Sequence, residues 1–149
     1  MHFRMRLRSI WLGTLCLLVT SSLIALDYQE GFDGDDVYIA VGEGTSKVGE
    51  TRPIQKDASA KRAARINAET RFADACIAPK SAGGHCREMT ADLKEVMSLG
   101  SGAKVVGSEC VEDAGAPGAL QCRVALKFTR KTLKAICAKL QEEGGQFCH

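Results

Sequence analysis

The most regular pattern along this chain is the run of residues 56–78, where small and apolar residues recur at every fourth position without an intervening Gly or Pro. Positions with this spacing share one face of a helix. Alanine contributes little hydrophobic free energy, about 0.8 kcal/mol per buried CH2-sized group, but it lets a helix approach its neighbour closely. The pattern therefore predicts a long helix that lies across a small sheet. Its apolar face consists of Ala60, Ala64, Ala68, Phe72 and Cys76, widened by Ala63 and Ala75.

The other face of this helix is charged, and sequence signals mark its ends. Arg65 and Glu69 have the i,i+4 spacing of a helical ion pair. Thr51 or Asp57 is expected to cap the first turn. Pro79 is expected to end the helix, because proline disfavours helical backbone in the residue before it. The residues expected to face solvent are Lys61, Arg62, Arg65, Glu69, Arg71 and Asp74.

Three other runs have the composition of β-strands. Residues 37–41 form a short β-branched and aromatic run that is followed by glycines. Residues 120–128 alternate between apolar and polar positions, and residues 103–111 form a second apolar run ahead of them. The connector at residues 112–119 contains turn-forming Gly and Pro, so the last two runs are predicted to form an antiparallel hairpin.

Two shorter helices complete the pattern, one at residues 86–99 closed by Gly100 and one at residues 131–141. A methionine-containing stripe such as that of the first helix is more often core than binding surface in a small domain. The chain is therefore predicted to be α+β, with an antiparallel sheet of about three strands packed by a long Ala-rich helix and two shorter helices. The apolar faces of the shorter helices are Met89, Leu93, Val96 and Met97 in the first, and Leu133, Ile136, Cys137 and Leu140 in the second.

The N-terminal 25 residues have the layout of a secretory signal peptide. Three arginines precede an uncharged, mostly apolar stretch at residues 10–25. This stretch is short for a membrane span and is diluted by Gly, Ser and Thr, so we expect cleavage after Ala25 or Ser22 rather than retention as an anchor. The expected organisation is a signal peptide at 1–25, an acidic leader at 26–36 and a single α+β domain at 37–149.

Cys16 raises a lipid anchor as an alternative, because bacterial lipoproteins are cut immediately before a cysteine that is then acylated. Leu15 occupies the position that this cleavage requires to be small. Cutting there would also leave an apolar region of only six residues. Membrane association is therefore expected only if Cys16 is lipidated.

Removal of the signal changes the charge balance of the chain. The full sequence has 20 basic and 18 acidic side chains, and residues 1–25 carry three arginines and no acid. The remaining chain has 17 basic and 18 acidic residues, a net charge of −1. It lacks the broad basic charge typical of nucleic-acid-binding proteins, so no nucleic-acid partner is expected.

Six cysteines remain after the signal. An even number behind a signal peptide indicates three disulfides in an oxidising compartment, each stabilising the fold by about 2–4 kcal/mol. Such bonds would compensate for an alanine-rich core. The sequence does not fix the connectivity, and our hypothesis joins neighbouring cysteines across short Gly-containing connections. The hypothesised pairs are Cys76 with Cys86, Cys110 with Cys122, and Cys137 with Cys148.

A metal site is the competing interpretation of some of these residues. The available donors are Cys76, His85, Cys86, Cys148 and His149. No C-x-x-C pair occurs in the chain, and the spacings match no zinc module. We therefore expect no metal and no other cofactor, with His85 and His149 as ordinary solvent-exposed residues.

The acidic leader offers a possible calcium site. Asp33, Asp35 and Asp36 lie close together in the sequence. They lack the alternating ligand positions and the closing glutamate of an EF-hand loop. A solvated, loose leader is therefore the favoured interpretation.

Residues 42–51 resemble a phosphate-binding loop in spacing, with Gly44, Gly49 and Thr51 at the corresponding positions. Glu50 stands where such a loop needs a lysine, and its carboxylate would repel the phosphates. Pro53 also delays the helix whose N-terminus would face them. We expect no nucleotide partner, and we interpret residues 42–51 as a strand-to-helix loop whose glycines allow positive φ.

The order of signal, strand ending in Gly-Glu-Gly, long alanine-laddered helix and later hairpin resembles the exported twenty-kilodalton outer-membrane lipoprotein family, which includes flagellum-associated envelope proteins. The resemblance covers roughly residues 37–128 and implies an envelope or appendage-assembly role without catalysis. It carries no binding residue over to this chain. The poor lipobox around Cys16 and the six later cysteines depart from the family pattern. The residues that carry the resemblance are Val41-Gly42-Glu43-Gly44, the ladder Ala60, Ala64, Ala68 and Phe72, and Val124-Ala125-Leu126.

These features favour a non-enzymatic exported protein of the cell envelope with a structural or assembly role. It would lie in the periplasm or at the outer-membrane periphery and bind an envelope protein. The small sheet also allows a homo-oligomer through its edge strands. The alternative is a small secreted ligand-binding module with its ligand between helix and sheet. A thiol enzyme is a third class, and it would need an unpaired, low-pKa cysteine.

Overall fold

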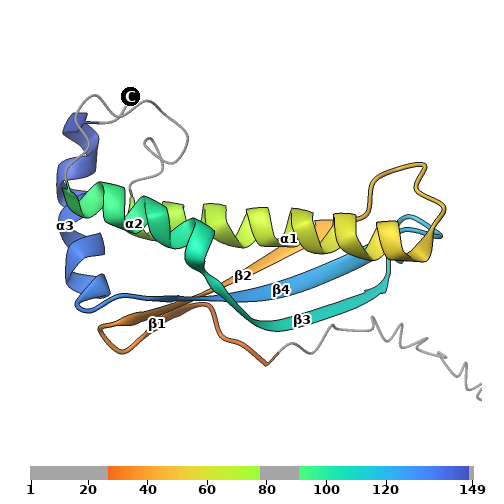
Figure 1. Cartoon of the computed structure of the whole chain (residues 1–149), viewed down its shortest axis with the longest axis horizontal. Coiled ribbons are helices and arrows are strands. Elements are labelled where there is room, and N and C mark those ends of the chain that lie inside the picture. Colours follow the sequence, from red (N-terminus) through yellow and green to blue (C-terminus); the bar gives the residue numbers. More distant parts are fainter. Residues whose placement is uncertain (1–26, 78–90, 148–149) are drawn as a thin grey trace, which may run out of the picture.

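The structure, a computed structural model, describes residues 27–77 and 91–147, without the side chains of residues 144–147. In the described residues, three helices and a four-stranded antiparallel sheet confirm the predicted α+β class (Figure 1). None of the helices in these ranges is long and apolar enough to cross a membrane. The elements are β1 (Gly31–Asp33), β2 (Val37–Thr45), α1 (Pro53–Cys76), α2 (Ala91–Gly102), β3 (Lys104–Glu112), β4 (Leu120–Thr129) and α3 (Leu133–Phe147).

The sheet has the strand order β1-β2-β4-β3, and every neighbouring pair is antiparallel. The hairpin predicted from residues 103–128 is present as β3 and β4. β2 pairs with β4 along its whole length, from Val37 opposite Thr129 to Thr45 opposite Gln121. The fourth strand, β1, pairs with only the first three residues of β2. One edge of the sheet is therefore much shorter than the strand beside it.

The prediction of a loose acidic leader is wrong, because residues 27–36 are tied to the rest of the fold. β1 lies within them and forms a hairpin with β2 through a turn in which Gly34 has φ +74°. The Asp36 carboxylate accepts a hydrogen bond from the Thr132 N–H at 2.6 Å, just ahead of α3. Glu30 forms an ion pair of 3.0 Å with Arg71 of α1. The aspartates considered as calcium ligands thus belong to a turn and a helix-capping contact.

Helix α1 packs directly on β2, as its alanine face predicted. The buried residues of the helix are those of the predicted apolar face, Ala60, Ala64, Ala68, Phe72 and Cys76. Gly42 and Gly44 belong to β2 rather than to the loop that the sequence suggested. A Cβ on Gly42 would lie 2.9 Å from the Cα of Ala68 and even closer to the Ala64 carbonyl oxygen. These glycines are therefore needed for the close approach of helix and strand.

The ends of α1 differ from the predicted signals. Arg52 is the N-cap residue and makes no side-chain capping bond, so neither Thr51 nor Asp57 caps the helix. Pro53 occupies the first turn, where its missing N–H costs no helical hydrogen bond. At the other end Ile77 has extended backbone and its N–H still donates to the Ala73 carbonyl. Pro79, the predicted terminator, lies outside the described residues.

The core is organised around four aromatic rings that connect β1, β2, α1 and β4. Phe32 meets Tyr38 edge-on at 4.9 Å between ring centroids, Tyr38 lies 5.5 Å from Phe72, and Phe72 stacks on Phe128 at 3.8 Å. Burial, and then the Glu30 carboxylate, raise the pKa of Tyr38 above its ordinary value, and the charge of Arg71 opposes this shift. Aromatic residues are only 5% of the chain, and this concentration compensates for the low volume of the alanine face.

The two shorter helices lie at the end of the molecule where α3 contacts α1 and α2 contacts β4 (Figure 1). Leu93 and Val96 of α2 and Leu133, Cys137 and Leu140 of α3 are buried, as predicted. Met97 is not part of this core, because its side chain is 54% exposed. α2 also continues to Gly102, past the Gly100 end that the sequence suggested. The predicted start at Cys86 and the position of Met89 lie outside the described residues.

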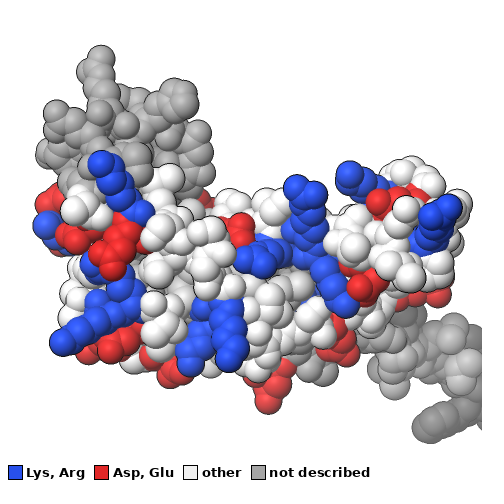
Figure 2. All heavy atoms as spheres, in the orientation of Figure 1, with Lys and Arg blue, Asp and Glu red and all other residues white. Residues whose placement is uncertain are grey.

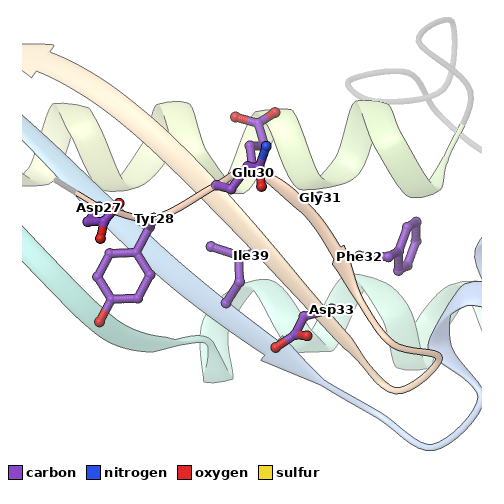
Figure 3. A pocket seen from close by; sticks show the side chains of 8 residues that line it. Asp27, Tyr28, Glu30, Gly31, Phe32, Asp33 and Ile39 are labelled. Carbon is purple, nitrogen blue, oxygen red and sulfur yellow. The ribbon is translucent and has the colours of Figure 1, made fainter.

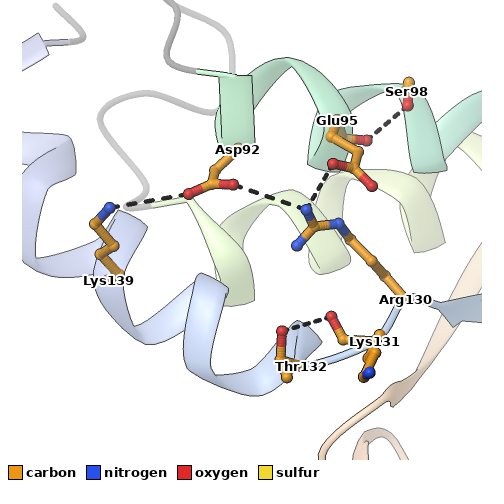
Figure 4. Close-up of polar contacts among 7 residues, drawn as sticks. All are labelled: Asp92, Glu95, Ser98, Arg130, Lys131, Thr132 and Lys139. Carbon is orange, nitrogen blue, oxygen red and sulfur yellow. Dashed lines mark hydrogen bonds and ion pairs between the residues drawn. The ribbon is translucent and has the colours of Figure 1, made fainter.

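Arg130, between β4 and α3, holds α2 in place (Figure 4). Its guanidinium is largely buried and lies 2.6 Å from the Glu95 carboxylate and 3.7 Å from that of Asp92. Lys139 of α3 approaches Asp92 from the other side at 3.9 Å. The hydrogen bond from Arg130, reinforced by its charge, lowers the pKa of Glu95 below the ordinary value of 4.5 against an opposing desolvation effect. The same contact raises the pKa of Arg130.

This cluster predicts an acid-sensitive contact. Because the folded pKa of Glu95 is depressed, its stabilising effect is present above pH 4.5 and is lost as the pH falls through the folded pKa. Glu95→Gln should therefore lower the urea midpoint at pH 7. Acidification to pH 3 should then lower the midpoint of this variant by less than it lowers that of the wild type. Glu142→Gln, an exposed position of α3, serves as the control. Equal pH dependence in wild type and Glu95→Gln would contradict this account.

Candidate functional site

The disulfide pairing was predicted correctly at one of three bonds. Cys110 and Cys122 are bonded across the β3–β4 hairpin, as hypothesised. Cys76 is bonded to Cys137, so the hypothesised Cys76–Cys86 and Cys137–Cys148 pairs are wrong. The end of α1 lies against α3, and this contact brings together two cysteines 61 residues apart. The other two predicted disulfide residues, Cys86 and Cys148, lie outside the described residues.

These bonds bear directly on thiol and metal chemistry. Cys76, the first donor of the alternative metal site, is in a disulfide, and the other donors of that set lie outside the described residues. Asp57, Cys110 and Cys122 form the one cluster of potential metal ligands within the described ranges. Both of its sulfurs belong to a disulfide, and the Asp57 carboxylate lies 3.5 Å from the Cys110 sulfur. A carboxylate there would disfavour a thiolate after reduction, which opposes a nucleophilic role for Cys110.

The segment that resembles a phosphate-binding loop has a different geometry. Gly44 is inside β2 and faces the backbone of α1 at residues 63 and 64. Glu50 accepts a hydrogen bond from the Ser59 hydroxyl. Only Gly49 has the positive φ, +87°, that the sequence suggested for the loop glycines. Residues 46–52 therefore form a tight strand-to-helix connection fastened to the first turns of α1.

A hollow of about 490 Å³ lies on the face of the sheet away from α1 (Figure 3). It is formed where residues 27–30 cross this face, and Tyr28 reaches over β4 to donate a hydrogen bond of 2.8 Å to the Val106 carbonyl on β3. Gly31, with φ +137°, turns the chain away from the β2 edge at this point. The hollow is lined by side chains of residues 27–33 together with Ile39. It is thus a consequence of how the leader crosses the sheet.

A larger groove of about 640 Å³ runs between the end of β2 and the outward side of α1. The apolar residues that line it are exposed or half-buried and lie along the same side of α1. They are Ala58, Ala63 and Ile66. The remaining lining residues are polar. They are Thr45, Lys47, Glu50, Gln55, Ser59 and Arg62.

The groove lies beside the open backbone edge of β2. In an antiparallel strand, successive residues direct their N–H and C=O groups alternately to the two sides. The Ser46 N–H donates to the Leu120 carbonyl on the β4 side at 2.8 Å, so Glu43, Thr45 and Lys47 direct their backbone groups the other way. Beyond Ile39 no described strand pairs with that side of β2. The result is a strand edge available for hydrogen bonding at residues 41–47.

Side chains of α1 accept hydrogen bonds from two of the backbone amide groups on this edge. Asn67 accepts a hydrogen bond from the Glu43 N–H at 3.2 Å, and Ser59 accepts one from the Lys47 N–H at 3.3 Å. No described side chain or loop amide donates to the outward carbonyl groups of Glu43 and Thr45. The edge is therefore only partly satisfied within the described part of the chain.

The charged groups of the groove are unevenly paired. Glu50 is engaged by Ser59. Arg62 and Lys47 are exposed, and neither side chain has an ion-pair partner among the described residues, whereas Lys61 and Arg65 each pair with an acid on α1. On the face of the molecule shown in Figure 2, Lys and Arg are interspersed with Asp and Glu. The groove is thus a local site of unpaired positive charge on a surface of mixed sign.

Two exposed apolar side chains lie at one end of the molecule, and a third lies further along α1 in the groove. We call this end the loop end: residues 46–52 and 113–119, opposite to α3 (Figure 1). Val48 is fully exposed, Ile54 is 85% exposed, and Ile66 in the groove is 53% exposed. A second hollow of about 340 Å³ separates the two loops. The loop end therefore offers apolar groups beside concave surface, which is typical of interaction sites.

Sequence reasoning missed both the open edge and its cause. The dipeptide Asp33-Gly34 between short apolar runs is a hairpin signal, and it would have located β1. The groove itself had no signal, because it depends on how far β1 extends along β2. Arg62 was predicted only as part of a solvated face.

Comparisons of this chain with family models, with curated proteins and with solved structures find no match. They assign no function to it. The chemistry of the loop end and of the groove is therefore the basis for a functional proposal.

Proposed function

We propose that this chain is a non-enzymatic, exported protein of the cell envelope that binds a protein partner in a structural or assembly role. The observation that carries the proposal is the exposure of Val48 and Ile54 at the loop end, next to the groove that contains Ile66. Apolar side chains of this size cost free energy in water and are typical of surfaces that become covered.

The disulfides support export. Cys76–Cys137 and Cys110–Cys122 stabilise the fold, and bonds of this kind persist in oxidising compartments. The predicted signal peptide would deliver the chain there. The resemblance to the exported twenty-kilodalton outer-membrane lipoprotein family also favours the periplasm or the outer-membrane periphery, with an appendage-associated role as one form of assembly function.

Two observations weigh against the other function classes. The four described cysteines are all disulfide-bonded, so a thiol enzyme would need a cysteine outside the described residues. A ligand between helix and sheet would need space that the contact of Gly42 with Ala64 and Ala68 fills. A binding role at the exposed surface is consistent with both observations.

Localisation can be tested by fractionating the native host and measuring the intact mass of the recovered chain. We expect the chain in the envelope fraction, shortened by its signal and with a mass that rises on reduction and alkylation. A full-length, fully reduced chain in the cytoplasm would overturn the proposal.

Partner binding can be tested in the same host by placing a photo-crosslinking amino acid at Val48. We expect a defined envelope protein to be captured from this position. The matched control is the same amino acid at Met97, an exposed apolar position on α2 remote from the loop end. Equal capture from both positions, or none from Val48, would contradict a binding role for the loop end.

A further inference from the structure

We propose that the groove beside α1 binds an extended, acidic peptide segment of a partner protein, which adds as a strand to the open edge of β2 at residues 41–47. This inference rests on the protein-binding role proposed above and names the chemistry of the partner. It starts from the backbone, because strand addition obtains its affinity from main-chain hydrogen bonds.

The edge has the required donors and acceptors. Glu43, Thr45 and Lys47 direct their backbone groups away from β4, and β1 leaves this part of β2 uncovered. The side chains of Asn67 and Ser59 occupy the positions that carbonyl oxygens of an added strand would take. Both are flexible polar groups, so an incoming backbone can replace them without breaking the sheet.

The helix beside the edge sets the side-chain preference. Alternate residues of an added strand face opposite sides of the sheet, so every second residue would lie against α1. There it meets Ala58, Ala63 and Ile66, whose small or apolar side chains leave room for a β-branched or other apolar residue. An extended segment with apolar residues at alternate positions fits this surface.

The charge of the groove determines which side chains the other residues of the peptide should carry. Arg62 and Lys47 line the groove without an ion-pair partner in the described ranges, and the one carboxylate in the lining, Glu50, which is hydrogen-bonded to Ser59, leaves the groove with a net charge of +1. An acidic side chain on the segment would complement the two cations, and a basic one would be repelled by them. The peptide is therefore acidic as well as extended.

The chain's own leader does not fill the edge in this structure. Continuing β1 along β2 would require residues 27–30 to follow the strand, but Gly31 turns them onto the opposite face of the sheet. There the Tyr28 hydroxyl is bonded to the Val106 carbonyl, while the side chain of Glu30 extends back to α1 and pairs with Arg71. A separate segment is consequently the occupant that the geometry favours.

The test uses the purified mature chain with the two described disulfides intact, and two short, end-capped synthetic peptides. One alternates valine with aspartate and the other alternates valine with lysine. We expect only the aspartate peptide to bind, with NMR shift changes concentrated in residues 41–47 and 55–66. Arg62→Glu should weaken its binding at least about tenfold, which is 1.4 kcal/mol. The control Lys94→Glu, the same charge change on α2, should leave binding unchanged.

Backbone bonding is tested by N-methylation of the aspartate peptide. Alternate amides of an added strand face β2 and the other amides face solvent. Methylating one alternate set should therefore abolish binding and methylating the other should preserve it. Equal effects of the two sets, binding of the lysine peptide with equal affinity, or no binding of the aspartate peptide would each overturn the inference.

Two other occupants give different results. If a second copy fills the edge, sedimentation will show a dimer whose stability the Arg62→Glu change alters. Adding the aspartate peptide will then not change the amount of dimer. If residues 27–30 fill the edge in solution, a chain beginning at Gly31 will bind the aspartate peptide while the longer chain does not. Either result overturns the inference. Specific crosslinking from Val48 would still support the binding role, so the two failures are distinguishable.

Discussion

Gly42→Ala is expected to destabilise the fold by at least about 3 kcal/mol, the upper end of the range for overpacked cores. The added methyl group would meet the Ala64 carbonyl and the Ala68 backbone, and neither can move aside as a side-chain end would. Relief requires α1 to lift from β2, which would also disturb the stacking of Phe72 on Phe128. Thermal unfolding should occur roughly 10–15 °C lower, and chemical denaturation should give the free-energy change directly.

Gly100→Ala is the matched control for this change. Gly100 lies in α2, and a Cβ there would meet no atom within 4 Å. Alanine is a better helix former than glycine by about 1 kcal/mol, so this variant should be neutral or slightly more stable. If the free energies of unfolding of Gly42→Ala and Gly100→Ala differed by less than about 0.5 kcal/mol, the described contact between α1 and β2 would be contradicted.

Replacing Cys76 and Cys137 together by alanine is expected to lower the free energy of unfolding by about 4 kcal/mol. Their bond closes a loop with a sequence separation of 61, whereas Cys110–Cys122 closes one of 12. In the chain-entropy account the longer loop restricts the unfolded chain more, and removing the shorter one should cost about 3 kcal/mol. Denaturant unfolding of the two double variants under non-reducing conditions compares these values.

Peptide mapping of the unreduced protein provides the check on this pairing. A proteolytic fragment containing Cys76 should be linked to one containing Cys137, and Cys110 should be linked to Cys122. Recovery of Cys76 linked to Cys86 would restore the sequential hypothesis and remove the basis for the expected difference. A larger loss for the Cys110–Cys122 variant would also contradict the entropic ranking.

The candidate site was only partly accessible from sequence. The exposed face of α1 was predicted, and with it Arg62, because helical periodicity separates its faces without reference to the rest of the chain. The open edge of β2 was not predicted. It exists because β1 begins only at Gly31 and because the residues before it, including Tyr28, cross the sheet instead of pairing with β2. Whether a strand edge is covered depends on contacts between distant residues, which no local pattern records.

The sequence by itself determined the α+β class, the alanine face of α1 and the β3–β4 hairpin, across which the hypothesised Cys110–Cys122 bond then forms. These features rest on local periodicity and short loops, where neighbours in sequence become neighbours in space. Only the tertiary structure decided that Gly42 and Gly44 are contact points beneath α1, that Cys76 pairs with Cys137, and that β2 keeps an open edge. Each of these depends on which elements meet across the core. That choice is set by the summed packing of the whole chain, because the free energy of any single local segment is too small to fix it.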